Sequence, residues 1–150
     1  MENKIVNVKI SIKARGSGTT RFWWRVIKNI EEKRYGDEQY VNVKEFEWIS
    51  RDTREIEIEE GSVLEIFAQH SGGWRCASVR HFFVVKEGEE DELSDKSGTR
   101  EIVLKTINLR RMRKEEVFEK FGFKKNNLGF WQKNEKECKE EMEKNIEKVI

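Results

Sequence analysis

The sequence of 150 residues contains no proline and only two cysteines. Cys76 and Cys138 are far apart and outside any C-x-x-C spacing, so neither a disulfide framework nor a zinc knuckle is indicated. Sparse cysteine is typical of the reducing cytosol, and we expect a cytoplasmic protein. The absence of proline removes the usual terminator of strands, and nothing in the sequence gives a physical reason for it.

Long hydrophobic runs are also missing. No stretch approaches the ~20 apolar residues of a membrane span, and the first residues have neither a signal-peptide core nor a transit-peptide composition. We therefore expect no membrane association and no standard export. Abundant Lys and Glu with few Gln resembles the composition of heat-adapted proteins, whereas nine Asn argue against a thermophilic source.

A large excess of one charge is absent too. The 30 Lys and Arg nearly cancel the 29 Asp and Glu, and the net charge of +1 excludes a generally polyanionic or polycationic surface. Nine Phe and five Trp concentrate hydrophobic area in few positions, so the chain can build a core although only 36% of it is hydrophobic. Any electrostatic signal must lie in the local segregation of charge.

The first two-thirds of the chain alternates between apolar and polar residues, which is the period-two pattern of half-buried strands. The connections are too short for parallel crossovers, so the sequence predicts a mainly β domain over residues 1–109, an antiparallel sandwich or barrel of about seven strands. The acidic residues 87–95 are expected to form a loop. The expected strands are 6–12, 21–30 (with a helix running to Gly36 as the alternative), 40–48, 54–58, 63–68, 74–86 and 101–107.

Residues 110–150 have a different, highly charged character, and they predict a helix-hairpin-helix extension that packs on the β domain or on a partner chain. Gly122 is placed to end the first helix, and residues 123–131 are typical of a tight hairpin. The second helix, from Glu135 onward, carries a narrow apolar stripe that could pair with a second copy of the chain. The stripe consists of Cys138, Met142, Ile146 and Val149.

Basic residues and aromatics occur together in three blocks. Residues 1–36 hold nine Lys or Arg and three acidic residues. Residues 66–86 hold three basic residues and no acidic one, and residues 110–136 hold nine basic and four acidic residues. A single-stranded nucleic acid would use this combination, because cations follow phosphates while exposed rings stack on bases. The candidate nucleic-acid-binding residues are Arg21, Trp23, Arg25, Trp74, Arg75, Arg80, Lys124, Lys125 and Trp131.

A structural interpretation competes with this one, because aromatics that alternate along a strand are usually core. The run Phe22-Trp23-Trp24 limits that interpretation. Consecutive strand residues face opposite sides of a sheet, so either Trp23 or the pair of Phe22 and Trp24 must lie outside the main core.

Catalytic and metal-binding signals are weak. His70, Cys76 and His81 lie within a dozen residues, but a structural zinc site needs a fourth ligand that the sequence does not provide. The Gly-rich residues 15–20 lack the Lys-Ser/Thr of a phosphate loop and are expected to form a hairpin turn. We therefore assign no catalytic residue, no metal site and no cofactor, and a non-enzymatic role is favoured over an enzymatic one.

Three functions are consistent with these features. The first is a non-catalytic nucleic-acid-binding protein that prefers single-stranded DNA or RNA. The second is a protein-interaction or assembly module, in which the same aromatics anchor an interface. The third and least favoured is a small nuclease using His70 or His81, or a hydrolase using the acidic residues 87–95.

Overall fold

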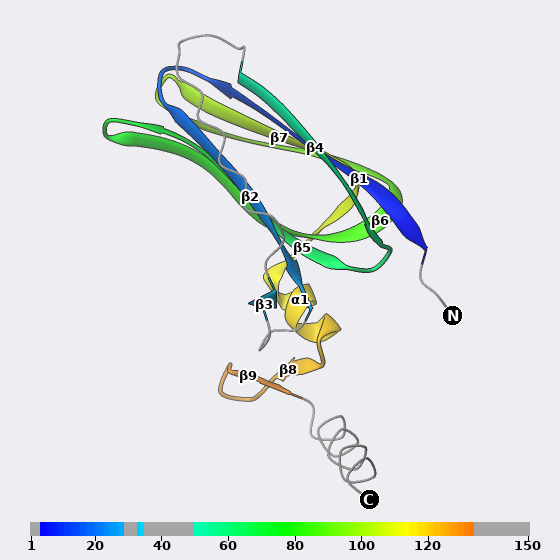
Figure 1. The fold of residues 1–150 in the computed structure, drawn as a ribbon. Coiled ribbons are helices and arrows are strands. Elements are labelled where there is room, and N and C mark those ends of the chain that lie inside the picture. Colours follow the sequence, from blue (N-terminus) through cyan, green and yellow to red (C-terminus); the bar gives the residue numbers. More distant parts are fainter. Residues whose placement is uncertain (1–3, 29–32, 35–49, 134–150) are drawn as a thin grey trace, which may run out of the picture. The chain divides into compact units, whose positions relative to one another are not determined.

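A computed structural model of the chain describes residues 4–28, 33–34 and 50–133 (Figure 1). The expected strand over 40–48 lies outside the described residues. So does the expected helix from Glu135, with the apolar stripe proposed for dimerisation. The chain divides into two compact units, Met1–Met112 and Arg113–Ile150.

The first unit is a single antiparallel sheet, which confirms the expected β class. Its order is β3-β2-β5-β6-β7-β1-β4, and every neighbouring pair is antiparallel. The alternative of a helix running to Gly36 is wrong over residues 21–27, since they lie in β2. The strands are β1 (Ile5–Arg15), β2 (Thr19–Ile27), the two-residue β3 (Lys33–Arg34), β4 (Ser50–Glu59), β5 (Val63–Gly72), β6 (Arg75–Ser97) and β7 (Arg100–Met112).

The sheet curls into a half-barrel, and among the described residues it forms neither a closed barrel nor two stacked sheets. The curl follows from irregularities in its two longest strands. The register of β6 against β7 shifts between Val85 and Glu90, and Asn108 in β7 has a φ of 65°. A bulge increases local twist and bends a strand, so the two halves of the sheet turn toward one another.

The core lies between these halves, as the period-two pattern predicts. Val8 and Ile10 of β1 are fully buried, and they share one hydrophobic cluster with Phe22, Ile66 and other inward residues of β2, β5, β6 and β7. Burying side chains from both halves stabilises the curl, because each half covers apolar surface that the other would leave in water.

The expected acidic loop over residues 87–95 is wrong, because most of this segment pairs with β7 as the second half of β6. Leu93 turns toward the core, and Glu92 lies opposite Lys105 on the other face. Cross-strand pairs of opposite charge make an acidic strand acceptable beside a basic neighbour. Acidity alone was therefore a poor indicator of a loop.

The second unit begins with the short helix α1 (Lys114–Lys120), followed by the hairpin of β8 (Phe123–Lys125) and β9 (Trp131–Lys133). Gly122, with a φ of 86°, follows the helix as predicted. Residues 110–112 belong to β7 and not to the extension. Phe118 stacks on Trp131, with ring centroids 5.0 Å apart. Among the described residues, no helix is long and apolar enough to cross a membrane.

Candidate functional site

Three hairpin turns of the half-barrel meet at one end of the sheet, which we call the hairpin end (Figure 1). A Cβ at Gly18 would lie 2.5 Å from the carbonyl oxygen of Ser71, and a Cβ at Gly16 would lie 2.7 Å from that of Thr99. Backbone therefore packs on backbone here, which only glycine permits. The turns are residues 16–18 between β1 and β2, residues 73–74 between β5 and β6, and residues 98–99 between β6 and β7.

His70 ties the first of these turns to β5. Its ring is 1% exposed, with Nε2 lying 2.8 Å from the carbonyl oxygen of Gly16 and Nδ1 lying 2.9 Å from the hydroxyl of Thr20. A carbonyl oxygen can only accept, so Nε2 carries the proton and donates it to Gly16. The imidazole is thus a buried structural link and is closed to solvent.

The side chains of two arginines, Arg75 and Arg100, link the turns to one another. The guanidinium of Arg100 donates from Nε to the carbonyl oxygen of Ser17 at 2.8 Å, and its Nη2 lies where a Cβ of Gly72 would be only 2.8 Å away. In the same way, a Cβ added at Gly98 would lie 2.7 Å from Nη1 of Arg75. Within the part of the chain that the structure describes, no carboxylate lies within ion-pair distance of either guanidinium.

Trp74 lies in the turn between β5 and β6, and it is the most exposed large hydrophobic residue among those described. Its relative exposure is 103%, and the residues on either side, Gly73 and Arg75, are exposed as well. A fully solvated indole gains nothing from burial, so the fold does not explain its presence at this position.

A second group, which we call the Trp23 cluster, lies on the outer face of β2, β5 and β6. It consists of Trp23, Arg25, Glu65, Phe67 and Arg80, and the strand register places Trp23 opposite Phe67 and Phe67 opposite Arg80. The rings of Trp23 and Phe67 stack at 5.1 Å, and the guanidinium of Arg25 lies 4.1 Å above the indole. Trp23 is only 8% exposed, so its neighbours already occupy much of its ring surface.

Glu65 sits at the centre of this cluster and is 7% exposed. Its Oε1 lies 3.4 Å from Nη2 of Arg80 and 3.6 Å from Nη1 of Arg25. Both arginines therefore have a carboxylate partner, whereas Arg75 and Arg100 have none among the residues that the structure describes. The prediction that Trp23 or its two neighbours must leave the main core is confirmed, because Phe22 and Trp24 are core and Trp23 is on the opposite face.

The nine predicted binding residues are thus divided among separate places. Arg21 is exposed on β2, two residues from Trp23 and on the same face. In the second unit, Nζ of Lys125 lies 5.9 Å above the ring of Trp131. Trp74 and Arg75 belong to the hairpin end, Trp23, Arg25 and Arg80 to the Trp23 cluster, and Lys124, Lys125 and Trp131 to the second unit.

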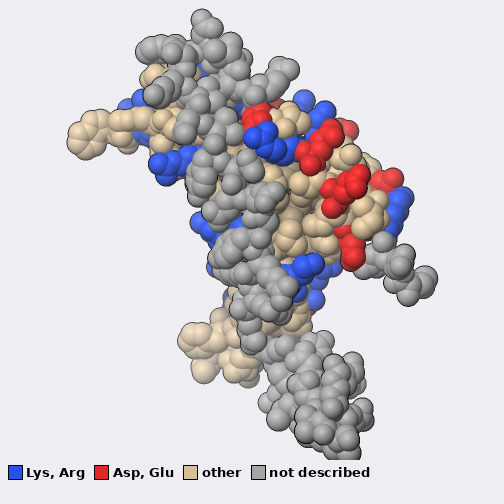
Figure 2. Space-filling view, in the orientation of Figure 1, with Lys and Arg blue, Asp and Glu red and all other residues tan. Residues whose placement is uncertain are grey.

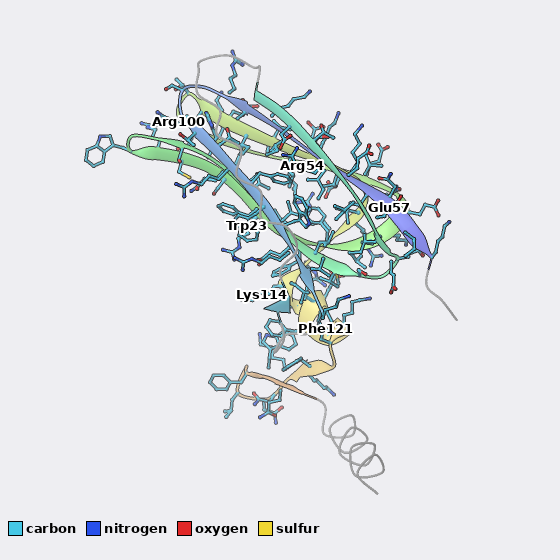
Figure 3. The ribbon with its side chains drawn as sticks, viewed as in Figure 1. Trp23, Arg54, Glu57, Arg100, Lys114 and Phe121 are labelled. Atoms are coloured by element: carbon cyan, nitrogen blue, oxygen red, sulfur yellow. The ribbon has the colours of Figure 1, made fainter. Side chains whose placement is uncertain are left out.

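The structure adds one residue that sequence reasoning missed, Arg100. The weakly alternating segment after the acidic stretch gave no reason to single it out. Its position directly after Gly98 and Thr99 is the only local signal that could have found it. Figure 3 labels Arg100 at the hairpin end, far along the sheet from Glu57 on β4.

Charge is segregated on the half-barrel. Glu55, Glu57 and Glu59 alternate along β4 and are exposed. Figure 2 shows acidic side chains gathered over β4 and mainly Lys and Arg toward the hairpin end. A local positive potential at the hairpin end is therefore compatible with a net charge of only +1.

The three candidate metal ligands do not converge. His70 faces the core, whereas Cys76 is exposed on the other face, where Nε2 of Gln69 donates to its sulfur at 2.9 Å. His81 is half-buried, and burial first, then the nearby charge of Arg111, lowers its pKa. In the described ranges, no group of three His, Cys, Asp or Glu side chains could hold a metal ion.

No protein-family model matches the chain, and no curated protein matches it significantly. The function is therefore inferred from the chemistry of the hairpin end and of the Trp23 cluster.

Proposed function

We propose that the protein binds single-stranded DNA or RNA at the hairpin end and catalyses no reaction. The observation that carries this proposal is the fully exposed indole of Trp74 beside Arg75 and Arg100, whose charges have no described carboxylate partner. Bases that leave a duplex expose their faces, and stacking one of them on an aromatic ring contributes about 1–3 kcal/mol.

The arginines supply the second requirement of such a ligand. A guanidinium is planar and always charged, and it can donate two parallel hydrogen bonds to one phosphate. Arg21, exposed on the outer face of β2, extends the positive surface away from the turns. The acidic β4 is kept apart, so it does not repel a strand that follows this route.

The Trp23 cluster has a supporting role in this proposal. Because Arg25 and Phe67 cover its ring, Trp23 holds a guanidinium in place and does not stack on bases. Glu65 already neutralises part of the charge of Arg25 and Arg80, so these two contribute less to phosphate binding than Arg75 does.

The test is a fluorescence-anisotropy titration of labelled single strands of about 15 nucleotides, at salt concentrations from about 50 to about 200 mM. We expect saturable binding that weakens with salt, and weaker binding of duplex DNA. Trp74→Ala should raise the Kd roughly 5- to 150-fold without changing the salt slope, whereas Arg75→Ala should reduce the slope by about one.

Glu57→Gln on the acidic strand serves as the matched control and should leave the Kd of a single strand nearly unchanged. Trp74→Ala should also leave the thermal unfolding midpoint unchanged, since the ring is fully solvated. Absence of binding at micromolar protein, or equal binding by Trp74→Ala, would refute the proposal.

A second candidate function, a protein-interaction module, is favoured by a different observation. In the hairpin of the second unit, Leu128 is 81% exposed and Phe130 is 66% exposed. Exposed apolar residues of this size are frequent anchors of protein interfaces. Size-exclusion chromatography with light scattering tests this function: it requires an oligomer that Phe130→Ser dissociates, with no affinity for nucleic acid.

A further inference from the structure

We propose that the hairpin end contains a preformed phosphate-binding site, built from the guanidinium groups of Arg75 and Arg100 and positioned by Gly72 and Gly98. The inference deepens the proposed function and rests on it, since the phosphate would belong to a nucleotide whose base stacks on Trp74. Arg100 joins Arg75 in the binding site, and the group that the two arginines recognise is the phosphate.

Arg75 and Arg100 each reach the turn beside the other's strand. Arg75 begins β6 and reaches the turn that contains Gly98, while Arg100 begins β7 and reaches back to Gly72. Gly72 is the register partner of Arg75 in the pairing of β5 with β6. The guanidinium of Arg100 therefore lies beside the backbone pair that Gly72 and Arg75 form. Both positive groups are thus brought to the seam between the same two turns.

Bringing two like charges together is unfavourable unless an anion joins them. The Trp23 cluster shows how this fold balances such a pair, because Glu65 lies between Arg25 and Arg80. Among the described residues, Arg75 and Arg100 have no equivalent carboxylate. An external anion would fill that role, and a phosphate oxygen suits the planar fork of a guanidinium.

The guanidinium of Arg100 is preorganised for binding. The carbonyl oxygen of Ser17 accepts from Nε of Arg100 at 2.8 Å, which fixes the plane of the guanidinium and leaves its Nη groups to bind. The turn that contains Ser17 is in turn held by the bond from His70 to Gly16. A side chain already fixed in its binding geometry loses less conformational entropy when the ligand arrives.

Gly72 provides an unusually selective way to test this site. The three atoms nearest to a Cβ there would all belong to the guanidinium of Arg100, with Nη2 at 2.8 Å, Nε at 3.0 Å and Cζ at 3.2 Å. Its φ does not lie in the left-handed region, so alanine fits the backbone without strain. At Gly98 the φ is 64°, and a substitution there would disturb the turn itself.

The experiment follows the Nε–H signal of Arg100 by NMR during titration with inorganic phosphate, together with anisotropy of a labelled single strand. We expect a saturable shift of that signal in the wild type. Gly72→Ala should weaken both phosphate and oligonucleotide binding about tenfold, and Arg100→Lys, which keeps the charge but loses the fork, should do the same. In an Arg100→Ala background, Gly72→Ala should have no further effect.

Ser71→Ala, at the neighbouring residue, is the matched control, because Ser71 meets the first turn through its backbone carbonyl. If single strands bind but Gly72→Ala binds them like the wild type, or acts equally without Arg100, the phosphate site is overturned while the proposed function stands. If phosphate shifts the Arg100 signal and no oligonucleotide binds, the site stands and the proposed function fails. If neither ligand has an effect, both are overturned.

Discussion

Replacing His70 by alanine should destabilise the half-barrel far more than replacing His81, the other histidine of the chain. The substitution removes a buried hydrogen bond to Thr20 and a partly buried one to Gly16, each worth about 1 kcal/mol net. It also leaves a cavity in place of a ring that is 1% exposed, which costs about 1–2 kcal/mol more. The free energy of unfolding should therefore fall by about 3–4 kcal/mol.

Urea unfolding followed by circular dichroism measures this loss, and thermal unfolding should show a decrease of roughly 2–4 °C for each kcal/mol. Thr20→Val keeps the shape but breaks one of the two bonds, so it should cost about 1–2 kcal/mol. Gln69→Ala, on the outer face next to His70, should stay within about 0.5 kcal/mol of the wild type. A His70→Ala variant as stable as Gln69→Ala would show that the ring does not tie the turn to β5.

Two further predictions concern single residues of the sheet. Because burial and then Arg111 lower the pKa of His81 from its ordinary 6.5, the stability it contributes is present above that pH and is lost as the pH falls through the lowered folded value. His81→Gln should therefore flatten the decrease in the urea midpoint between about pH 7.5 and about pH 5, and an unchanged slope would contradict this. Asn108 has a φ of 65°, donates to Asn7 and accepts from the amide of Gly88, so Asn108→Ala should cost about 2–3 kcal/mol and Asn108→Gly about 1 kcal/mol less. If Asn108→Ala and Asn108→Gly lose the same free energy of unfolding in chemical denaturation, the positive φ of Asn108 contributes nothing to the difference.

The candidate site was only partly predictable. Trp74 and Arg75 were identified because an aromatic and a cation occur together in a basic block of the sequence, although Trp74 was expected to begin a strand and lies in the turn before it. Arg100 was not, since its role depends on Gly72, a residue distant in sequence that reaches it only through the curl of the sheet. Trp23 was correctly placed outside the main core, but its neighbours Arg25 and Phe67, which cover it, come from the strand register.

The sequence by itself determined the local features of this protein. Alternation over residues 6–12 defined a strand and its buried face, Gly122 marked the end of a helix, and the hairpin that follows was recognisable from its turn residues. Side-chain periodicity is a local property of the backbone, so it can be detected without knowledge of the partners. The tertiary structure alone decided that residues 87–95 extend a strand, that the sheet bends near Asn108, and that three turns meet at one end. These features depend on which strands pair and where the register shifts, and such long-range contacts leave little trace in any single segment.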